Sequence, residues 1–387
     1  MCGIAGILRV HAPGQAPPPH VAIPEAWLDI LDESIKHRGP DGQGRFRDRA
    51  VRPDGSVVDV ALVHRRLSIL DHAGGAQPMV LPSSNSSVAH PTGSLRPCRR
   101  CAANGHGTIA VVFNGCIYNH RELRRELQAA GHEFSTDHSD TEVLVHGWGE
   151  WATELPTRLD GMFAAAIWDH ARAELALARD LAGEKPLYRF GGAFASCIPG
   201  LVRLAPARGE RIADPIHPTA IEGWVRFGAL LYTPWGRNES EGIQAIEEVY
   251  PAGLWRDHFV RVGETGNTSA FREFDHARWA TAFDGVATKS SGFPRRGDRG
   301  QLSSDAAERL LRTAVGTRLE ADVPLACFLS GGLDSSLIAA FAQEHLRGAG
   351  RRLRTICVRM PDRAYDESEF ATAVARQLGT DHLVLPA

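Results

Sequence analysis

Two stretches of this 387-residue sequence carry residue types that can do chemistry, and the first is Cys2. A residue this small after Met1 commonly permits removal of the methionine, which leaves a thiol and an α-amine on one residue. The reference pKa of that amine, about 7.7–8.0, lets it accept the thiol proton near neutral pH. Cys2 is therefore a candidate N-terminal nucleophile, although an isolated second-position cysteine is more often a small buried residue.

The second stretch is Leu325–Ser336, in which an apolar run ends in Gly331 and Gly332 and small hydroxyl residues flank Asp334. This order predicts a buried parallel strand, a tight loop and a helix N-terminus. The N–H groups at such a helix end can bind phosphate, and the carboxylate of Asp334 suits Mg²⁺. The lysine of a P-loop is missing, and an ordinary strand–helix turn is the alternative interpretation.

Hydrophobic periodicity predicts the elements that must position these residues. Asn119 and Glu122 have the spacing of a helix-capping pair, and Asp366 is a candidate cap further on. The last part of the chain alternates strands and helices, which predicts a parallel sheet with ligands at its carboxyl edge. The predicted strands are Met1–Ile7, Val60–His64, Ile109–Phe113, Met162–Trp168, Leu175–Ala178, Leu353–Val358 and His382–Leu385, and the predicted helices are Ala26–Ile35, Asn119–Gln128, the segment from Ser139, and Asp366–Leu378.

Several strings resemble, in order, the class II glutamine amidotransferase domain: Met1–Ile7, His37–Asp41, Arg65–Asp71, Asn114–His120, Ser139–Glu142 and Gly183–Tyr188. Ser330–Ser336 resembles the loop of the ATP pyrophosphatase superfamily. The combination resembles the glutamine-hydrolysing asparagine synthetase family. The resemblance implies an α+β N-terminal nucleophile sandwich with αββα layers, followed by an α/β doubly wound parallel-sheet ATP-pyrophosphatase domain that is incomplete at its C-terminus.

The same resemblance implies three segments. Residues 2–200 would form the amidotransferase domain, with an insertion at 81–107, residues 201–230 a connection, and residues 231–387 the N-terminal part of the ATP-binding domain. Family members continue well beyond Ala387, so we expect apolar surface to be exposed on the second domain.

In the first domain, the resemblance implies that Cys2 attacks the side-chain amide of L-glutamine. The Asn114 side chain and the Gly115 N–H would meet the oxyanion. Arg66 would bind the α-carboxylate and Asp140 the α-ammonium group of the substrate. The implied glutamine-binding residues are Arg66, Leu67, Ser68, Ile69, Leu70, Asn114, Gly115, Cys116 and Asp140.

In the second domain, the resemblance implies that ATP adenylates L-aspartate before ammonia forms asparagine, with ATP and Mg²⁺ as cofactors and Asp334 as the candidate Mg²⁺ ligand. Phe328 and Val358 would hold the adenine, and we also expect both to pack in the core. The implied ATP-binding residues are Phe328, Leu329, Ser330, Gly331, Gly332, Leu333, Asp334, Ser335, Ser336 and Val358.

The sequence departs from the family pattern at two places. Cys116 stands where the family has a glutamate that helps to bind the glutamine amine. Loss of that carboxylate predicts weaker glutamine binding, by about 1–3 kcal/mol. Cys197 and Pro199 stand where the family has Glu and Lys, which puts ammonia transfer in question.

The insertion at 81–107 contains Cys98 and Cys101 at the spacing of a metal-binding pair, with His90 and His106 nearby. One such pair needs two further ligands to bind zinc. A reversible disulfide is the second interpretation. A solvated loop with incidental cysteines is the third and the simplest.

The composition is that of an ordinary globular protein, 43% hydrophobic and 23% charged, with a net charge of -3. It predicts no nucleic-acid or membrane partner. Seven scattered cysteines without a secretory signal favour the cytoplasm. A stand-alone glutaminase and a non-catalytic truncated paralogue that acts as a binding protein remain as alternative functions, and a homodimer or a complementing C-terminal chain as alternative assemblies.

Overall fold

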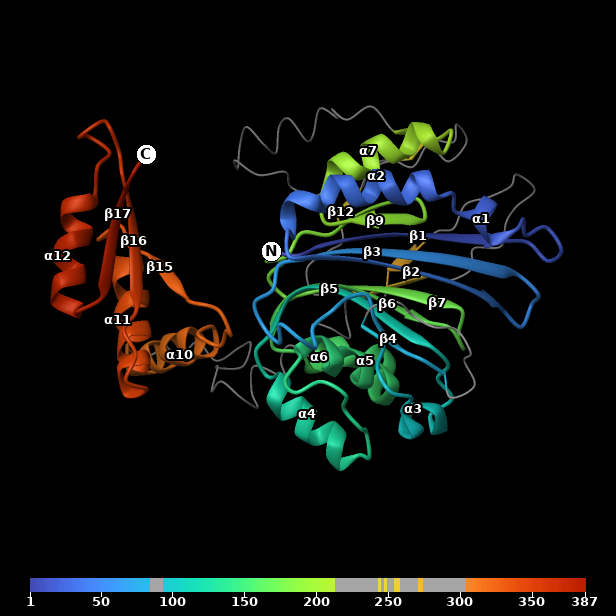
Figure 1. Ribbon diagram of the computed structural model, residues 1–387, viewed down its shortest axis with the longest axis horizontal. Helices are drawn as coiled ribbons and strands as arrows, with labels where there is room; N and C mark the ends of the chain where they lie inside the picture. Colours follow the sequence, from blue (N-terminus) through green and yellow to red (C-terminus); the bar gives the residue numbers. More distant parts are fainter. Residues whose placement is uncertain (84–92, 213–242, 245–246, 249–253, 258–270, 274–303) are drawn as a thin grey trace. The chain divides into compact units, whose positions relative to one another are not determined.

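The computed structural model describes residues 1–83, 93–212, 243–244, 247–248, 254–257, 271–273 and 304–387 (Figure 1). The chain divides into two compact units, Met1–Ala282 and Phe283–Ala387. Among the described residues, no helix is long and apolar enough to cross a membrane.

The first sheet of the first unit has the strand order β12-β8-β9-β1-β3-β2, and its pairings are antiparallel. Its central strand β1 (Gly3–His11) pairs on one side with β3 (Val57–Arg66), with Gly3 opposite Arg65. Cys2, which directly precedes β1, therefore lies at the same sheet end as Arg66. The other strands are β2 (Gly42–Val51), β8 (Tyr188–Phe190), β9 (Ala193–Ala195) and β12 (Glu247–Glu248).

The second sheet has the order β14-β13-β7-β6-β5-β4 and is also antiparallel. Its strands β6 (Gly161–Asp169) and β7 (Glu174–Arg179) form the predicted hairpin. The other strands are β4 (Met79–Leu81), β5 (Ile109–Ile117), β13 (Leu254–Asp257) and β14 (Phe271–Glu273).

The two sheets stack face to face around one buried core. Alternate residues of each strand point to the same face, so Ile4 and Leu8 of β1 join Leu62 of β3 on the inner side. Val112 and Trp168 of the second sheet belong to the same buried cluster. Apolar side chains of both inner faces thus hold the sandwich together.

Helices cover both outer faces of the sandwich, as Figure 1 shows. Helices α2 (Glu25–Ile35) and α7 (Ile198–Ala207) pack on the first sheet, and α4 (His120–Ala129) and α5 (Asp140–Trp151) pack on the second. The αββα layering that the resemblance implied is confirmed. The shorter elements are α1 (Pro19–Ala22), η1 (Lys36–Arg38), α3 (Arg99–Ala103), η2 (Ala152–Glu154), α6 (Leu155–Arg158), β10 (Arg211–Ile212) and β11 (Ile243–Gln244).

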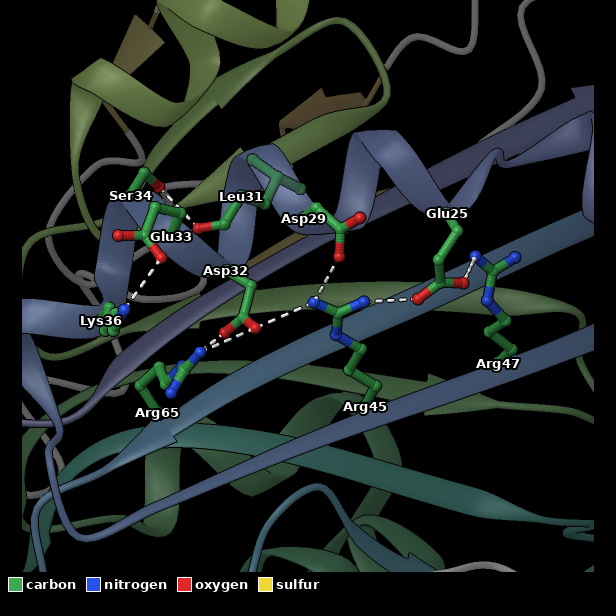
Figure 2. Close-up of polar contacts among 10 residues, drawn as sticks. All are labelled: Glu25, Asp29, Leu31, Asp32, Glu33, Ser34, Lys36, Arg45, Arg47 and Arg65. Atoms are coloured by element: carbon green, nitrogen blue, oxygen red, sulfur yellow. Dashed lines mark hydrogen bonds and ion pairs between the residues drawn. The ribbon is translucent and has the colours of Figure 1, made fainter.

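Ion pairs tie helix α2 to strands β2 and β3 (Figure 2). Arg45 contacts Glu25, lies 2.8 Å from Asp29 and 2.9 Å from Asp32, while Arg65 approaches Asp32 from the other side at 2.9 Å. Burial alone would raise the pKa of Asp32, but hydrogen bonds from Arg65 and Arg45 outweigh it and lower the pKa. Asp32 is therefore a charged link between helix and sheet.

We expect Asp32→Ala to lower the free energy of unfolding by about 2–3 kcal/mol, below the cost of breaking a fully buried pair, because both arginines keep some contact with water. Asp29→Ala is the matched control: its side chain is 63% exposed against 9% for Asp32, so it should cost less than about 1 kcal/mol. Because the pKa of Asp32 is lowered in the folded state, the difference between wild type and Asp32→Ala should shrink as the pH falls below the ordinary aspartate range. Urea unfolding at several pH values measures this, and equal effects of the two substitutions would contradict it.

The second unit contains a parallel sheet in the order β15-β16-β17. Strand β15 (Ala326–Phe328) connects through α11 (Leu333–Gly348) to β16 (Arg354–Arg359), and α12 (Ser368–Leu378) connects to β17 (Asp381–Pro386). The predicted parallel β-α-β-α-β run is confirmed. Helix α10 (Ser304–Thr317) contributes Val315 to the core of this unit.

Two local details differ from the expected caps. Helix α4 begins after Asn119, but the Asn119 side chain bonds the carbonyl of Arg158 and the N–H of Asp160 instead of its own helix. Helix α12 begins at Ser368, two residues later than expected, and Asp366 accepts a hydrogen bond from the Ser368 N–H at 3.1 Å. Tertiary contacts redirect the first of these side chains.

The interpretation of the 81–107 insertion as a solvated loop is wrong for its described part. Residues 84–92, with His90, lie outside the described residues. Leu95, Cys98 and Cys101 are buried in the core beneath the second sheet, and helix α3 carries Cys101. Apolar contacts thus anchor a segment whose overall composition is polar.

The segment predicted as a connection, 201–230, begins inside the first unit. Leu201, Leu204 and Ala205 of α7 are buried in the core between α2 and the first sheet. Residues 213–230 lie outside the described residues. These apolar residues recur at the spacing of a helix, and that pattern in the sequence would have predicted a helix packed on a core.

Candidate active site

Cys2 directly precedes β1, and its side chain points to the loop that follows β3. Its Sγ accepts a hydrogen bond from the Leu67 N–H at 3.3 Å and lies 3.6 Å from the Leu67 carbonyl oxygen. In the chain that retains Met1, burial raises the pKa of the Cys2 thiol, and the Leu67 N–H acts in the opposite direction. The thiol therefore needs a nearby base to ionise at neutral pH.

Arg66, the last residue of β3, is held in place by the loop that follows it. Its guanidinium donates to the carbonyl oxygens of Leu70 at 3.2 Å, Asp71 at 2.6 Å and His72 at 2.9 Å. A Cβ on Gly75 would lie 2.3 Å from Nη2 of Arg66, so only glycine leaves room for this arrangement. Three backbone acceptors thus fix the orientation of a planar cation beside the thiol.

Asn114 lies on β5 with the same parity as Ala110 and Val112, whose side chains face the inner core. Asn114 is 1% exposed, and its Nδ2 has no hydrogen-bond partner among the described residues. A buried donor without a partner is costly unless a ligand uses it. The next residue, Gly115, has no room for a side chain, because a Cβ would lie 2.1 Å from the Met162 carbonyl oxygen.

Asp140 begins helix α5 and is buried, where its Oδ2 accepts the Ile117 N–H at 3.2 Å. Burial raises the pKa of this carboxyl, while the Ile117 N–H acts to lower it. Arg66 and Asp140 both act electrostatically on Cys2: the arginine lowers and the aspartate raises the pKa of the thiol. The structure therefore brings a thiol, a cation and an anion into one neighbourhood.

The remaining predicted glutamine-binding residues lie around these groups. Leu67 contacts the thiol, and Ser68 donates its N–H to Asp41 at 2.8 Å, so the conformation of the loop is fixed near the nucleophile. Ile69 and Leu70 are half-buried in the same loop. Cys116 is half-buried on β5, two residues after Asn114, and is not in a disulfide.

Two residues near the chain start were not assigned roles from the sequence. Arg38 donates from Nε to the Cys2 carbonyl oxygen at 3.1 Å, and the Nζ of Lys185 lies 3.5 Å from the Met1 Sδ. Burial lowers the pKa of the Lys185 ammonium group. Both residues lie in stretches that resemble the amidotransferase family, His37–Asp41 and Gly183–Tyr188, and this resemblance could have identified them.

The second departure from the family pattern lies where β9 passes into α7. The Ser196 hydroxyl accepts the Ile4 N–H at 3.0 Å, and Cys197 is the residue before the helix, with Pro199 at its second position. A backbone N–H at this position has no partner within the helix, so a proline, which lacks the N–H, is accommodated there.

The loop between β15 and α11 in the second unit has the expected strand–turn–helix form. Gly331 has φ +86, and a Cβ there would lie 2.6 Å from the Phe370 backbone. Ser330 and Ser335 are linked through their hydroxyls at 2.9 Å. Helix α11 has no side-chain cap at Gly332, so the N–H groups of its first turn can donate hydrogen bonds to an anion.

Several predicted ATP-binding residues are exposed at this loop. Leu333 and Asp334 are exposed in the first turn of α11, Leu329 is buried, and the buried Ser336 Oγ has no hydrogen-bond partner among the described residues. The expectation that Phe328 and Val358 pack in the core is wrong, since they are 75% and 42% exposed. The predicted exposure of apolar surface on this unit is thus observed.

Comparisons with known proteins follow the same two units. Residues 1–93 and 100–217 match the glutamine amidotransferase domain family, and residues 306–386 match the asparagine synthase family. Asparagine synthetase [glutamine-hydrolyzing] 1 of Bacillus subtilis is 29% identical over 387 residues, which cover 99% of this chain and 50% of that protein. Asparagine synthetase [glutamine-hydrolyzing] 1 of Arabidopsis thaliana is 27% identical over 391 residues, which cover 99% of this chain and 50% of that protein.

The chain thus spans about half the length of these curated relatives. Among solved structures, the glutamine phosphoribosylpyrophosphate amidotransferase of B. subtilis is 16% identical, with a TM-score of 0.39, and the match covers 100% of this chain and 81% of that one. The first family match alone contains more than half of the residues. The chain therefore belongs to the glutamine amidotransferase domain family, and its second unit carries an asparagine synthase region.

Proposed function

We propose that the first unit hydrolyses L-glutamine to glutamate and ammonia, with Cys2 as the nucleophile. The observation that carries this proposal is the Cys2 thiol bonded by the Leu67 N–H, directly after the fixed guanidinium-bearing residue Arg66, and the buried carboxylate of Asp140 supports it. The zwitterionic end of glutamine requires one anion and one cation. The Asn114 side chain, whose Nδ2 has no hydrogen-bond partner in the described part of the chain, belongs to the inner face of the adjoining sheet.

In the proposed reaction, removal of Met1 turns the Cys2 nitrogen into an α-amine that accepts the thiol proton. The thiolate attacks the amide carbon of glutamine, and the Asn114 amide and the Gly115 N–H stabilise the oxyanion. The carbon–nitrogen bond then breaks, and the leaving nitrogen takes a proton from the α-amine and departs as ammonia. Water cleaves the resulting thioester, which releases glutamate and restores the thiol.

Cys116 bears on substrate affinity in this proposal. A thiol replaces the carboxylate that the resemblance places near the glutamine ammonium group, so Asp140 is left as the principal counter-charge. We propose glutamine binding that is weaker by about 1–3 kcal/mol than with a carboxylate at this position. Cys116→Glu should therefore lower the KM for glutamine.

For the second unit we propose ATP binding at Phe328–Ser336, as part of an asparagine synthetase that adenylates L-aspartate and amidates it with the ammonia. The uncapped first turn of α11 fits phosphate oxygens, and so does the Ser336 hydroxyl, which bonds none of the residues that the structure describes. Asp334, exposed in the same turn, fits Mg²⁺. Mg²⁺, when bound, neutralises charge on the phosphates, and Asp334 would hold it beside them.

The test measures two products on the full chain. Glutamate release from glutamine reports on the first unit, and aspartate-dependent pyrophosphate release reports on the second. Glutamate without pyrophosphate would support the stand-alone glutaminase alternative, and neither product would support a binding protein. Size determination in solution distinguishes a homodimer or a complementing chain from a monomer.

Mass spectrometry after treatment with a glutamine-derived electrophile should show loss of Met1 and labelling at Cys2. An unlabelled Cys2 would overturn the proposed nucleophile.

Asp140→Asn should raise the KM for glutamine by roughly 10- to 100-fold, because it removes a charge-assisted contact to the ammonium group. The substitution should also raise the melting temperature at neutral pH. The pKa of Asp140 is raised in the folded state, so the ionised carboxylate destabilises the fold above that pKa. For the same reason, glutamine binding by the wild type should weaken as the pH falls through this pKa. Steady-state kinetics and thermal unfolding check both effects, and an unchanged KM would contradict the assigned contact.

A further inference from the structure

A cluster of two cysteines and two histidines lies beneath the second sheet, apart from the candidate active site. Cys98, Cys101, His132 and His146 are 4%, 2%, 3% and 0% exposed. One ligand atom from each lies within 4.8 Å of all the others. His106, considered a neighbour of the cysteines on sequence grounds, is instead paired with Asp169 at 2.8 Å.

The distances within this cluster match the edges of a tetrahedral zinc site. Nδ1 of His132 lies 3.5 Å from the sulfur of Cys98 and 3.5 Å from that of Cys101, and Nδ1 of His146 lies 3.8 Å from the latter. The two Nδ1 atoms are 3.3 Å apart. Zinc bonds of about 2.3 Å to sulfur and 2.0–2.1 Å to nitrogen give sulfur–nitrogen edges of about 3.5 Å and nitrogen–nitrogen edges of about 3.4 Å.

A carboxylate lies beside the outer nitrogen of each imidazole ring. Nε2 of His132 lies 3.1 Å from Glu150, and Nε2 of His146 lies 3.4 Å from Glu142. Glu150 is itself held by Arg100 at 2.7 Å. Carboxylates that fix the outer nitrogen of a metal-bound histidine are a recurrent feature of zinc sites.

The inner nitrogens of the two rings lie close together. The Nδ1 atoms of His132 and His146 are 3.3 Å apart in a buried space, and each lies within 3.8 Å of a cysteine sulfur. A divalent cation among the four atoms would accept an electron pair from each nitrogen, and two thiolates would balance its charge.

The local structure makes room for the ligands. Cys98 precedes α3 and Cys101 lies within it, while His132 follows α4 and His146 lies in the middle of α5. A Cβ on Gly149 would lie 2.4 Å from the sulfur of Cys101, so glycine at this position of α5 admits the sulfur. The ligands thus connect three segments that are distant in the sequence.

We propose that Cys98, Cys101, His132 and His146 bind one Zn²⁺ ion as a structural site. Binding deprotonates both thiols and releases two protons per ion. Four protein ligands leave no position for a substrate, and a set of two sulfurs and two nitrogens in tetrahedral arrangement favours zinc among divalent metals. The ion would hold α3 and the end of α4 against α5, the helix that begins at Asp140.

The test uses the full chain without a histidine tag, purified under reducing conditions. Elemental analysis should find about one zinc per chain, and Co²⁺ in its place should give the visible absorption of a tetrahedral site with a thiolate-to-cobalt band. Cys98→Ser and His146→Asn should each lower zinc content at least about fivefold, because three ligands hold zinc less firmly. Cys197→Ser is the matched control: this thiol contacts Ser34, outside the cluster, and its loss should leave the zinc content unchanged.

A variant that fails to fold does not decide the matter, so the wild-type chain supplies an independent measurement. With zinc bound, Cys98 and Cys101 should resist alkylation, and a strong chelator should expose both together and lower the melting temperature. Zinc below about 0.1 per folded wild-type chain after growth with added zinc would overturn the proposal. So would a Cys98–Cys101 disulfide in the purified chain, or unchanged zinc content in Cys98→Ser.

Discussion

Cys2→Ala should reduce the rate of glutamine hydrolysis at least about 1,000-fold, because no other group in the proposed mechanism can form the thioester. The loss should appear in kcat, while the affinity for glutamine should change little, since Arg66 and Asp140 remain in place. The folded structure should also survive. Cys2 precedes β1, and the hydrogen bonds of its thiol in the described part of the chain are to the backbone of Leu67. Glutamate release and circular dichroism of the same preparation check the two expectations.

Cys197→Ala is the control for this experiment. Cys197 is another half-buried thiol of the first unit, but it precedes α7 and contacts the Ser34 carbonyl oxygen at 3.3 Å. It should retain the wild-type turnover of glutamine. If Cys2→Ala kept more than about a tenth of the activity, the covalent mechanism would be excluded. Activity in chains that all retain Met1 would exclude the α-amine of Cys2 as the base.

Asn114→Ala should lower kcat for glutamine hydrolysis by about 100- to 1,000-fold, the usual cost of removing one oxyanion donor. The reason lies in the geometry of β5, which directs Asn114 toward the inner face and leaves its Nδ2 without a partner in the described part of the chain. The same observation predicts a second, independent result. Removal of a buried donor that bonds none of the described residues should leave the melting temperature unchanged or raise it slightly.

Asn119→Ala is the matched control for that substitution. Its side chain bonds the Arg158 carbonyl oxygen at 2.8 Å and the Asp160 N–H at 3.0 Å, near the surface. It should leave kcat unchanged and lower stability by about 1 kcal/mol. A large loss of stability in Asn114→Ala, or an unchanged kcat, would show that Asn114 supports the fold instead of the reaction.

Local patterns in the sequence predicted most of the secondary structure in the described part of the chain. The continuous apolar run Val60–Val63 gave the position of β3, and the stretch through Cys116 and Ile117 extends β5 beyond the predicted strand. The loop at Ser330–Ser336 was predicted from glycine and serine at fixed positions. These features depend on residues that are close in the sequence, so the local sequence pattern is enough to predict them. The layers and the proposed roles came from the resemblance.

The tertiary structure decided what depends on residues distant in the chain. Cys98 and Cys101 read as part of a solvated loop because their two histidine partners lie on later segments, and only the packing of α3, α4 and α5 brings the four together. The exposure of Phe328 was missed because strand periodicity does not show which faces other elements cover. The sequence by itself thus determined the elements and the candidate chemistry. Packing decided which residues are buried, left the Asn114 Nδ2 without a partner among the described residues, and assembled the ligand cluster. Each of these depends on contacts between segments far apart in the chain.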